Sequence, residues 1–171
     1  GGPLQPMGRT GDRWAVTVDV PVSDASACGG DLRTDLSQGR LQTVILAIPE
    51  AETAATYGAT PLVNGGGQLG TTIIIDGLTP GVTIRKNKWL NLVISGRHYL
   101  YEVRAAVTAN GDGQAAVPIW PMIRRSPANN AAVILDDPVI EGFAQMEGGF
   151  SARRFGDRVL TAMRFRLEER E

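Results

Sequence analysis

The sequence predicts an all-β protein, a mainly antiparallel barrel or sandwich with one short helix near the N-terminus. Apolar and polar residues alternate along several short segments, as the two faces of a half-buried strand require. The 21 glycines and 10 prolines stand largely between these segments, where tight turns need them. With 171 residues, 43 % of them hydrophobic, the chain is long enough to bury a core of its own.

The first strand is expected over 13–20. Trp14, Val16 and Val18 fall on one face of it, while Arg13 and Thr17 fall on the other. Such a strand has one buried and one solvated face. The proline that follows cannot donate a ladder hydrogen bond, so it ends the strand.

A short helix is expected over 24–38, with Ser23 as its N-cap and Gly39 as its C-cap. Gly29 and Gly30 weaken its middle by about 1 kcal/mol each relative to alanine, so the alternative is a broken helix or two turns. The segment 42–48 is apolar on both faces and therefore favours a central strand.

The remaining segments alternate or are short apolar runs separated by turn residues. Expected turns are Ser95–His98 and Asn110–Gly113, and the Asn-Gly pair favours a type I′ hairpin. Further strands are expected over 62–63, 71–76, 89–94, 99–107, 115–120, 131–135, 139–144 and 158–168.

We expect residues 1–12 to form an extended arm and residues 13–171 to form a single β-rich domain. Within that domain, 60–145 is expected to be a barrel-like unit inserted between the first strands and the C-terminal strand. The predicted core consists of Trp14, Val16, Val18, Trp89, Tyr101, Val103, Ile119 and Trp120.

Charge and cysteine content narrow the classes of partner. The 17 basic and 18 acidic residues leave a net charge of -1, so neither nucleic-acid recognition nor binding to an anionic membrane is expected. The single cysteine, Cys28, excludes an internal disulfide and a cysteine zinc cluster. The opening residues lack the basic and apolar regions of a signal peptide, and no apolar run is long enough to predict a membrane span.

No catalytic residue, cofactor site or metal site is predicted, and the protein is not expected to be an enzyme. His98, the only histidine, is expected to be a solvent-facing turn residue, and nothing near Cys28 lowers a thiol pKa. The loop 110–113 lacks the spaced oxygen ligands of a calcium loop. Asp136 and Asp137 could bind a cation, but acids before a proline are expected to form an ordinary loop. The loop 65–70 lacks the lysine and following helix of a phosphate loop.

Four aromatic residues leave an alternative open. Trp89, Tyr99, Tyr101 and Trp120 lie within one β region, and Tyr99 and Tyr101 share a face of their strand. Core packing is the ordinary fate of such residues. If two or more of them lie on an exposed face, the alternative function is a carbohydrate-binding β-module.

Taken in order, several phrases of this sequence resemble the distal tail proteins at the tail tip of siphophages and related prophages. The matching phrases are Gly11–Trp14, Pro61–Gly65, Gln68–Gly70, the strand ending Asp76–Leu78, Tyr99–Val103, Asn110–Gly113, Ile119–Arg124, Ser126–Ala128, Asp137–Pro138 and a C-terminal strand ending in acids.

This resemblance implies structural work rather than catalysis. Proteins of that family form homo-oligomeric rings, usually hexamers, that join the tail tube protein to the baseplate hub or tail fibre proteins. The implied location is the virion, with assembly in the host cytoplasm. As candidate interface residues we name Arg153, Arg154, Arg164 and Arg166, which are expected to pair with acids of a neighbouring copy.

Overall fold

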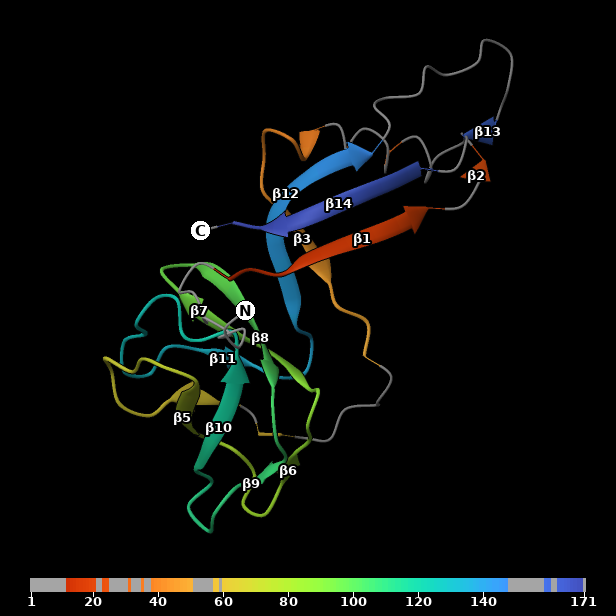
Figure 1. Cartoon of the computed structure of the whole chain (residues 1–171). Coiled ribbons are helices and arrows are strands. Elements are labelled where there is room, and N and C mark those ends of the chain that lie inside the picture. Colours follow the sequence, from red (N-terminus) through yellow and green to blue (C-terminus); the bar gives the residue numbers. More distant parts are fainter. Residues whose placement is uncertain are drawn as a thin grey trace, which may run out of the picture. The chain divides into compact units, whose positions relative to one another are not determined.

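The computed structural model describes residues 12–20, 23–24, 31, 35, 38–50, 57–58, 60–147, 159–160 and 163–170. The predicted all-β class is confirmed, because these residues form fourteen strands that pair antiparallel (Figure 1). They divide into two compact units. The described residues of Trp14–Leu46 and Ile140–Glu171 make the flanking unit, and Ala47–Val139, with Asp12 and Arg13, make the inserted unit.

The inserted unit contains most of the strands. They are β4 (Leu62–Val63), β5 (Thr72–Asp76), β6 (Thr83–Ile84), β7 (Trp89–Ile94), β8 (Arg97–Val103), β9 (Val107–Thr108), β10 (Ala115–Trp120) and β11 (Val133–Ile134). Six of these form one sheet in the order β11-β7-β8-β10-β5-β4, and β6 pairs with β9.

Backbone hydrogen bonds join the two ends of this six-stranded sheet. Val63 N–H donates to Ala131 O at 2.9 Å, and Asn130 N–H donates to Val63 O at 2.9 Å. On the other side, Val93 N–H donates to Ala132 O at 2.9 Å. The segment leading into β11 therefore bridges β4 and β7, and the sheet closes on itself as a small barrel.

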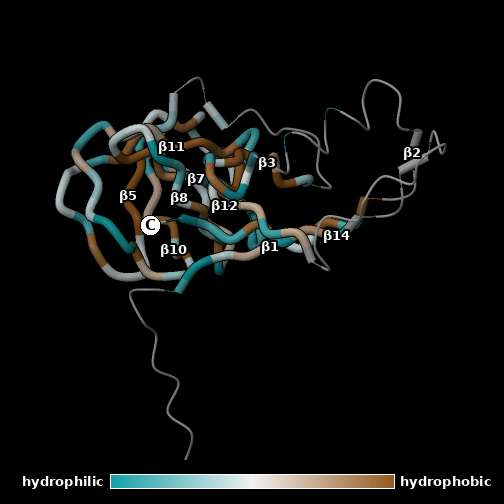
Figure 2. The backbone as a smooth tube through the Cα atoms, turned by 90° about the horizontal axis from the view of Figure 1, so that it is seen from above, coloured by the Kyte–Doolittle hydropathy of each residue, from teal (hydrophilic) through white to brown (hydrophobic). Residues whose placement is uncertain are grey.

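The core of the inserted unit lies inside this closed sheet. Alternate residues of β5 and β10 point inward, so Ile73 and Ile75 face the same interior as Val117 and Ile119, and all four side chains are fully buried or nearly so. Figure 2 shows β5 and β11 among the hydrophobic segments of this unit. Burial of apolar side chains at about 25 cal/mol per Å² is the main stabilising contribution here.

Of the two predicted hairpin turns, the one at Ser95–Gly96 is confirmed and the one at Asn110–Gly111 has a different geometry. Ser95 and Gly96 have φ of 52° and 75°, and they connect the pair Ile94 and Arg97, so the type I′ turn lies here. Neither Asn110 nor Gly111 has a positive φ, and the type I′ prediction for that turn is wrong.

At the second turn, Gly113 N–H donates to Asn110 O at 3.0 Å, and Gly113 itself has a φ of 72°. The Asn110 side chain explains this longer loop. Its Oδ1 accepts from the N–H of Asp112 at 3.0 Å and from that of Gln114 at 2.8 Å.

The described residues of the flanking unit form a four-stranded sheet of order β1-β14-β12-β3, so the central position expected for the strand over 42–48 is wrong and β3 is an outer strand there. Phe165 and Leu167 of β14 are buried, and Arg164, Arg166 and Glu168, which alternate with them, are exposed, so the predicted alternation of the last strand is confirmed there. The strands are β1 (Ala15–Val20), β3 (Val44–Ala47), β12 (Val139–Glu147) and β14 (Met163–Glu169), with a small pair formed by β2 (Ser23–Asp24) and β13 (Val159–Leu160).

The predicted helix over 24–38 is not established by the described residues. Asp24 lies in β2 and pairs with Val159, which contradicts a helical start there. Asp31, Asp35 and Gln38 do have helical backbone, and Gly39 N–H donates to Asp35 O at 2.8 Å. The glycine therefore follows a helical turn, as its predicted C-cap role requires.

The observed strand boundaries differ from the predicted ones where a run predicted as one strand forms two strands. The run 99–107 begins earlier, at Arg97, and its strand ends at Val103, with β9 starting at Val107. The run 158–168 is divided between β13 and β14. Two-residue strands such as β2 and β6 carry no alternation, and sequence patterning gives no signal for them.

The predicted core is only partly correct. Tyr101, Val103 and Ile119 are buried, as expected. Trp120 is 38 % exposed, and its assignment to the core is wrong. Ile119 and Trp120 are consecutive in β10 and must point to opposite faces, so only one of them can face the interior. The other predicted core residues, Trp14, Val16, Val18 and Trp89, are half-buried.

Candidate functional site

Of the two residues weighed as catalytic groups, His98 and Cys28, the structure describes His98. His98 lies within β8, opposite Val93, and is half-buried, so its expected place in the turn is wrong. Cys28 lies outside the described residues. No group of three or more His, Cys, Asp or Glu side chains in the described ranges is placed to hold a metal ion. Among the described residues there is likewise no helix with the length and apolar character to cross a membrane.

The glycine-rich loop 65–70 is a β connection held by two side chains, since Gly65 N–H donates to Asn129 Oδ1 at 2.8 Å and Gln68 makes the other bonds. Gln68 Nε2 donates to the carbonyl oxygens of Asn64 and Gly65, both at 2.8 Å, and Gln68 Oε1 accepts from Ile74 N–H at 2.7 Å. Gly65, Gly67 and Gly70 have φ of 88°, 80° and 87°. The glutamine amide thus fixes the loop to β5, a role that no sequence pattern predicted.

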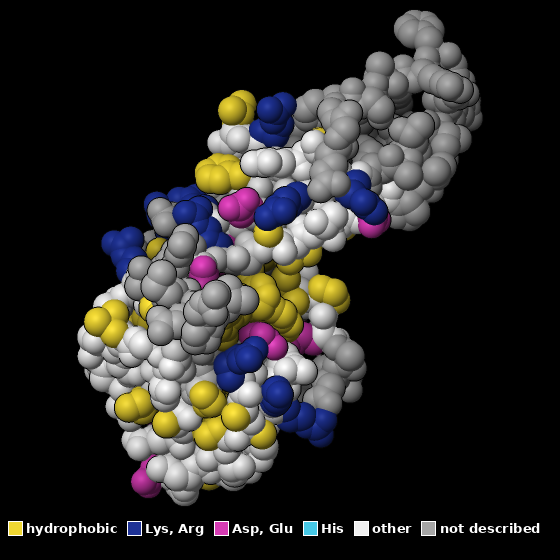
Figure 3. Space-filling model, viewed as in Figure 1, with side chains coloured by type: hydrophobic (Ala, Val, Ile, Leu, Met, Phe, Trp, Pro, Cys, Tyr) yellow, Lys and Arg dark blue, Asp and Glu magenta, His cyan; other side chains and the backbone are white. Residues whose placement is uncertain are grey.

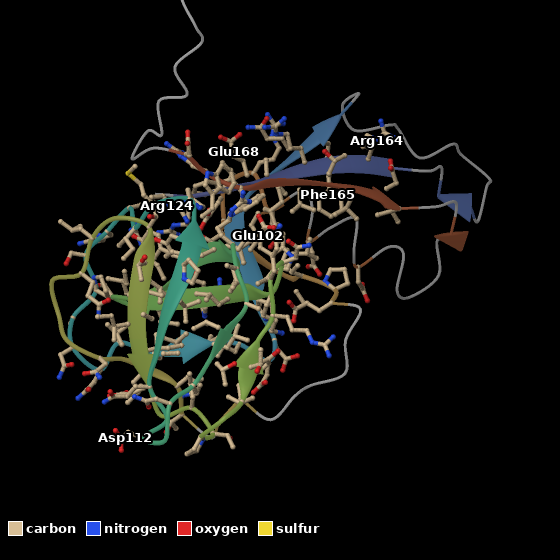
Figure 4. All side chains as sticks on the ribbon, turned by 60° about the horizontal axis from the view of Figure 1, so that its bottom comes forward. Glu102, Asp112, Arg124, Arg164, Phe165 and Glu168 are labelled. Atoms are coloured by element: carbon tan, nitrogen blue, oxygen red, sulfur yellow. The ribbon has the colours of Figure 1, made fainter. Side chains whose placement is uncertain are left out.

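Two of the four aromatic residues belong to the interior. Tyr99 and Tyr101 are buried, and the Arg124 guanidinium lies 5.4 Å from the centre of each ring. Arg124 N–H also donates to the Tyr101 hydroxyl at 3.3 Å, and Arg124 Nη2 donates to Leu100 O at 3.3 Å (Figure 4). This cluster ties the chain after β10 to β8, and it is structural.

The other two aromatic residues flank an acid on the outer face of the barrel. Trp89 of β7 and Trp120 of β10 are both register partners of Glu102 of β8. Directly opposed residues share a face of a sheet. The chain neighbours Leu90, Tyr101 and Ile119 point to the opposite face, toward the interior, and are buried. We call this set the Trp89–Glu102–Trp120 row. With strands about 4.8 Å apart, the two tryptophan Cα atoms lie roughly 10 Å from each other.

A hollow of about 270 Å³ adjoins one end of this row. The Glu50 carboxylate lies at its wall, where it forms an ion pair with Lys88 and accepts from Trp89 N–H at 3.0 Å. Lys88 also lies 5.2 Å from the centre of the Tyr57 ring. Figure 3 shows Lys and Arg side chains beside acidic ones on the surface of this unit. The lining residues are Pro49, Glu50, Arg85, Lys86, Asn87, Lys88 and Trp89.

The flanking unit carries a charged sheet face on β1 and β14. Arg164 Nε and Nη2 donate to the two carboxylate oxygens of Asp19, at 2.6 and 3.2 Å, which is a bidentate pair (Figure 4). The hydrogen bond from Arg164 lowers the pKa of Asp19 below 3.8; desolvation opposes this and the positive charge of Arg164 adds to it. Arg166 lies 3.9 Å from Glu168 of the same strand.

These contacts bear on the predicted interface arginines. Arg164 and Arg166 both have acidic partners within their own chain, and both side chains are exposed. Arg153 and Arg154 lie outside the described residues. Pairing with the acids of a neighbouring copy therefore stays a prediction, and for Arg164 it would compete with the bidentate Asp19 contact.

Large apolar side chains are exposed on both units. Leu41 is 88 % exposed, Ile45 56 % and Phe143 41 % on the flanking unit, and the Arg170 guanidinium lies 5.9 Å from the centre of the Phe143 ring. On the inserted unit the exposed ones are Leu69, Ile74 and Trp120. Scattered apolar residues are normal on surfaces, but side chains of this size are also the usual material of interfaces.

No protein-family model matches this chain, and no curated protein matches its sequence.

The sequence predicts one part of the row but not its assembly. The alternation Tyr101–Glu102–Val103 already places Glu102 on the face opposite the core. What was missing is the pairing of three strands, which sets this acid between two tryptophans that are distant in sequence.

Proposed function

We propose that this protein is a structural subunit of a phage tail tip, which assembles with copies of itself into a ring that joins the tail tube to the baseplate hub or fibres. The biological setting comes from the ordered sequence phrases between Gly11 and the C-terminal strand that resemble distal tail proteins. A hexameric ring is the expected assembly.

The observation that carries the proposal is the exposed apolar surface of the flanking unit. Ile45 of β3, Phe143 of β12 and the nearby Leu41 remain open to solvent in a single chain. Covering such side chains against another subunit removes apolar area from water, and obligate interfaces gain much of their stability in this way. In the proposed ring, a neighbouring copy of the chain would cover these side chains.

The open sheet supports the same proposal. In the described part of the sheet, β1 and β3 are the outer strands. Outer strands present backbone donors and acceptors on one side, which natural proteins cover or pair. A contact between different surfaces of identical chains closes into a ring when its rotation divides a full turn.

The test is the mass of the protein in solution across a wide concentration range, by light scattering and native mass spectrometry, with negative-stain imaging of the assembled species. We expect a defined multiple of the chain mass and ring-shaped particles. Ile45→Lys and Phe143→Lys should lower the assembled fraction by placing a charge in the interface. Ile74→Lys, on the inserted unit, is the matched control. A monomeric mass over the whole range would contradict the proposal.

A further inference from the structure

The Trp89–Glu102–Trp120 row has the composition of a ligand site and lies in the inserted unit, whereas the ring proposed above is argued from the flanking unit. We propose that this row binds a saccharide, with the two indole rings stacking on sugar rings and the Glu102 carboxylate accepting hydrogen bonds from sugar hydroxyls.

The backbone that carries the row is fixed by hydrogen bonds. Asn87 N–H donates to Val103 O, and Val103 N–H donates to Lys88 O, both at 2.8 Å. Trp89 N–H is held by Glu50 Oε1 at 3.0 Å. The three residues of the row thus sit on strands rather than on loops, and a site built on strands loses little conformational entropy on binding.

The residue types suit a polyhydroxylated ligand. A half-buried and a partly exposed indole ring offer flat apolar surfaces with little entropy cost. A carboxylate accepts several hydrogen bonds, and its side chain here is 18 % exposed, within reach of a ligand at the surface. Spaced about two strands apart, the rings can take successive or alternate sugar units.

A cationic ligand fits the row less well. Arg104 already lies 3.5 Å from the Glu102 carboxylate and supplies its positive partner. The hollow beside Trp89 is lined by Arg85, Lys86 and Lys88, against one acid, Glu50. A second cation would meet like charges there, whereas sugar hydroxyls or a sugar carboxylate accept hydrogen bonds from the same groups.

An apolar protein partner also fits less well, because closing a dry interface over the row would bury the Glu102 carboxylate. Burying a charge without full hydrogen bonding is costly. A saccharide supplies those hydrogen bonds, and the adjoining hollow gives room for one end of it.

The experiment is a titration of the full chain with cello-, chito- and malto-tetraoses to hexaoses, and with oligogalacturonates, followed by tryptophan fluorescence and by saturation-transfer NMR. We expect one of these probes to bind. Trp120→Ala and Glu102→Gln should each weaken binding by at least about tenfold. Trp14→Phe, which changes the tryptophan outside the row, should leave the affinity unchanged.

Folding is checked separately by thermal unfolding. Trp120 is 38 % exposed and glutamine has nearly the size of glutamate, so both variants should keep the parent thermal midpoint. The oligogalacturonate arm shows whether the basic hollow contributes, since an acidic sugar would then bind more tightly than the neutral probes. The proposal is overturned if no probe binds at concentrations up to about 10 mM. It is equally overturned if binding survives both substitutions, or if arginine amide or tetramethylammonium binds to the row in their place.

Discussion

The two units bury their strands to different degrees. In the inserted unit the sheet closes, and Ile73, Ile75 and Leu92 are wholly inaccessible to solvent. In the flanking unit, Leu167 of the inner strand β14 is just as inaccessible, but its cross-strand partner Val16 on the outer strand β1 is only half-buried.

This difference follows from closure. A barrel has no edge strand, and every strand has a neighbour on each side. The described part of the flanking sheet is open, so its outer strand has less to pack against. The closed sheet therefore covers the core of the inserted unit, while Ile45 and Phe143 stay exposed on the flanking sheet, where the proposed assembly would cover them.

The largest expected effect comes from Ile75→Ala in β5 of the barrel. Removing this buried side chain should lower the free energy of unfolding by about 3–5 kcal/mol, because a closed core cannot collapse fully around the cavity. Ile74→Ala, at the next residue on the exposed face, is the control and should cost under about 1 kcal/mol. Guanidinium denaturation measures both. Equal effects would show that the barrel interior is not where the structure places it.

The second effect tests the open sheet. Leu167→Ala should cost about 2–3 kcal/mol, at the lower end of the range for buried leucine, because the half-buried strand beside it can shift into the space. Val16→Ala, on that outer strand, should cost about 1 kcal/mol or less. The measurement is denaturation of the monomeric form. A loss as large as that of Ile75→Ala would remove the contrast between the two units.

The third effect concerns a turn of the barrel. Gly113 has a φ of 72°, and a Cβ built there would lie 2.3 Å from Leu78 O, so Gly113→Ala should cost about 1–3 kcal/mol. Gly111→Ala, in the same turn, has open space and no positive φ, and should change stability by less than about 0.5 kcal/mol. Thermal unfolding of the two variants, compared side by side, would contradict the structure if their order were reversed.

The smallest effect lies on the charged sheet face. The lowered pKa of Asp19 means that its pairing with Arg164 adds stability above pH 3.8, and that this contribution is lost as the pH falls through the lowered folded-state value. Because both groups are exposed, the contribution is small.

The direct measurement is an NMR titration of the Asp19 carboxyl carbon. Its midpoint should lie below 3.8 in the parent protein and rise toward 3.8 in Arg164→Gln. Arg166→Gln, the neighbouring arginine on the same face, should leave it unchanged. If the Asp19 midpoint were the same in the parent protein and in Arg164→Gln, the bidentate pair would be absent in solution.

Local sequence patterns predicted the positions of barrel strands better than the contacts between distant side chains. The strand over 89–94 and that over 115–120 were correct to the residue, because alternation and flanking turns are local signals. Asn91 shows the limit. It is fully buried, and its side chain donates to Val139 O at 2.8 Å and accepts from Val139 N–H at 2.7 Å. No residue near Asn91 in the sequence predicts that its side chain pairs with Val139.

By itself, the sequence determined the all-β class, most strand positions and the two faces of strands such as β5 and β10, since side-chain alternation depends only on neighbouring residues. Consecutive residues are buried in β7 and β8, which alternation does not predict. Tertiary structure decided which strands are adjacent and in what register. That long-range pairing placed Glu102 between Trp89 and Trp120, put Ile119 rather than Trp120 in the core, and closed one sheet while leaving the described part of the other open. Register depends on contacts between residues far apart in the chain, and no local pattern encodes it.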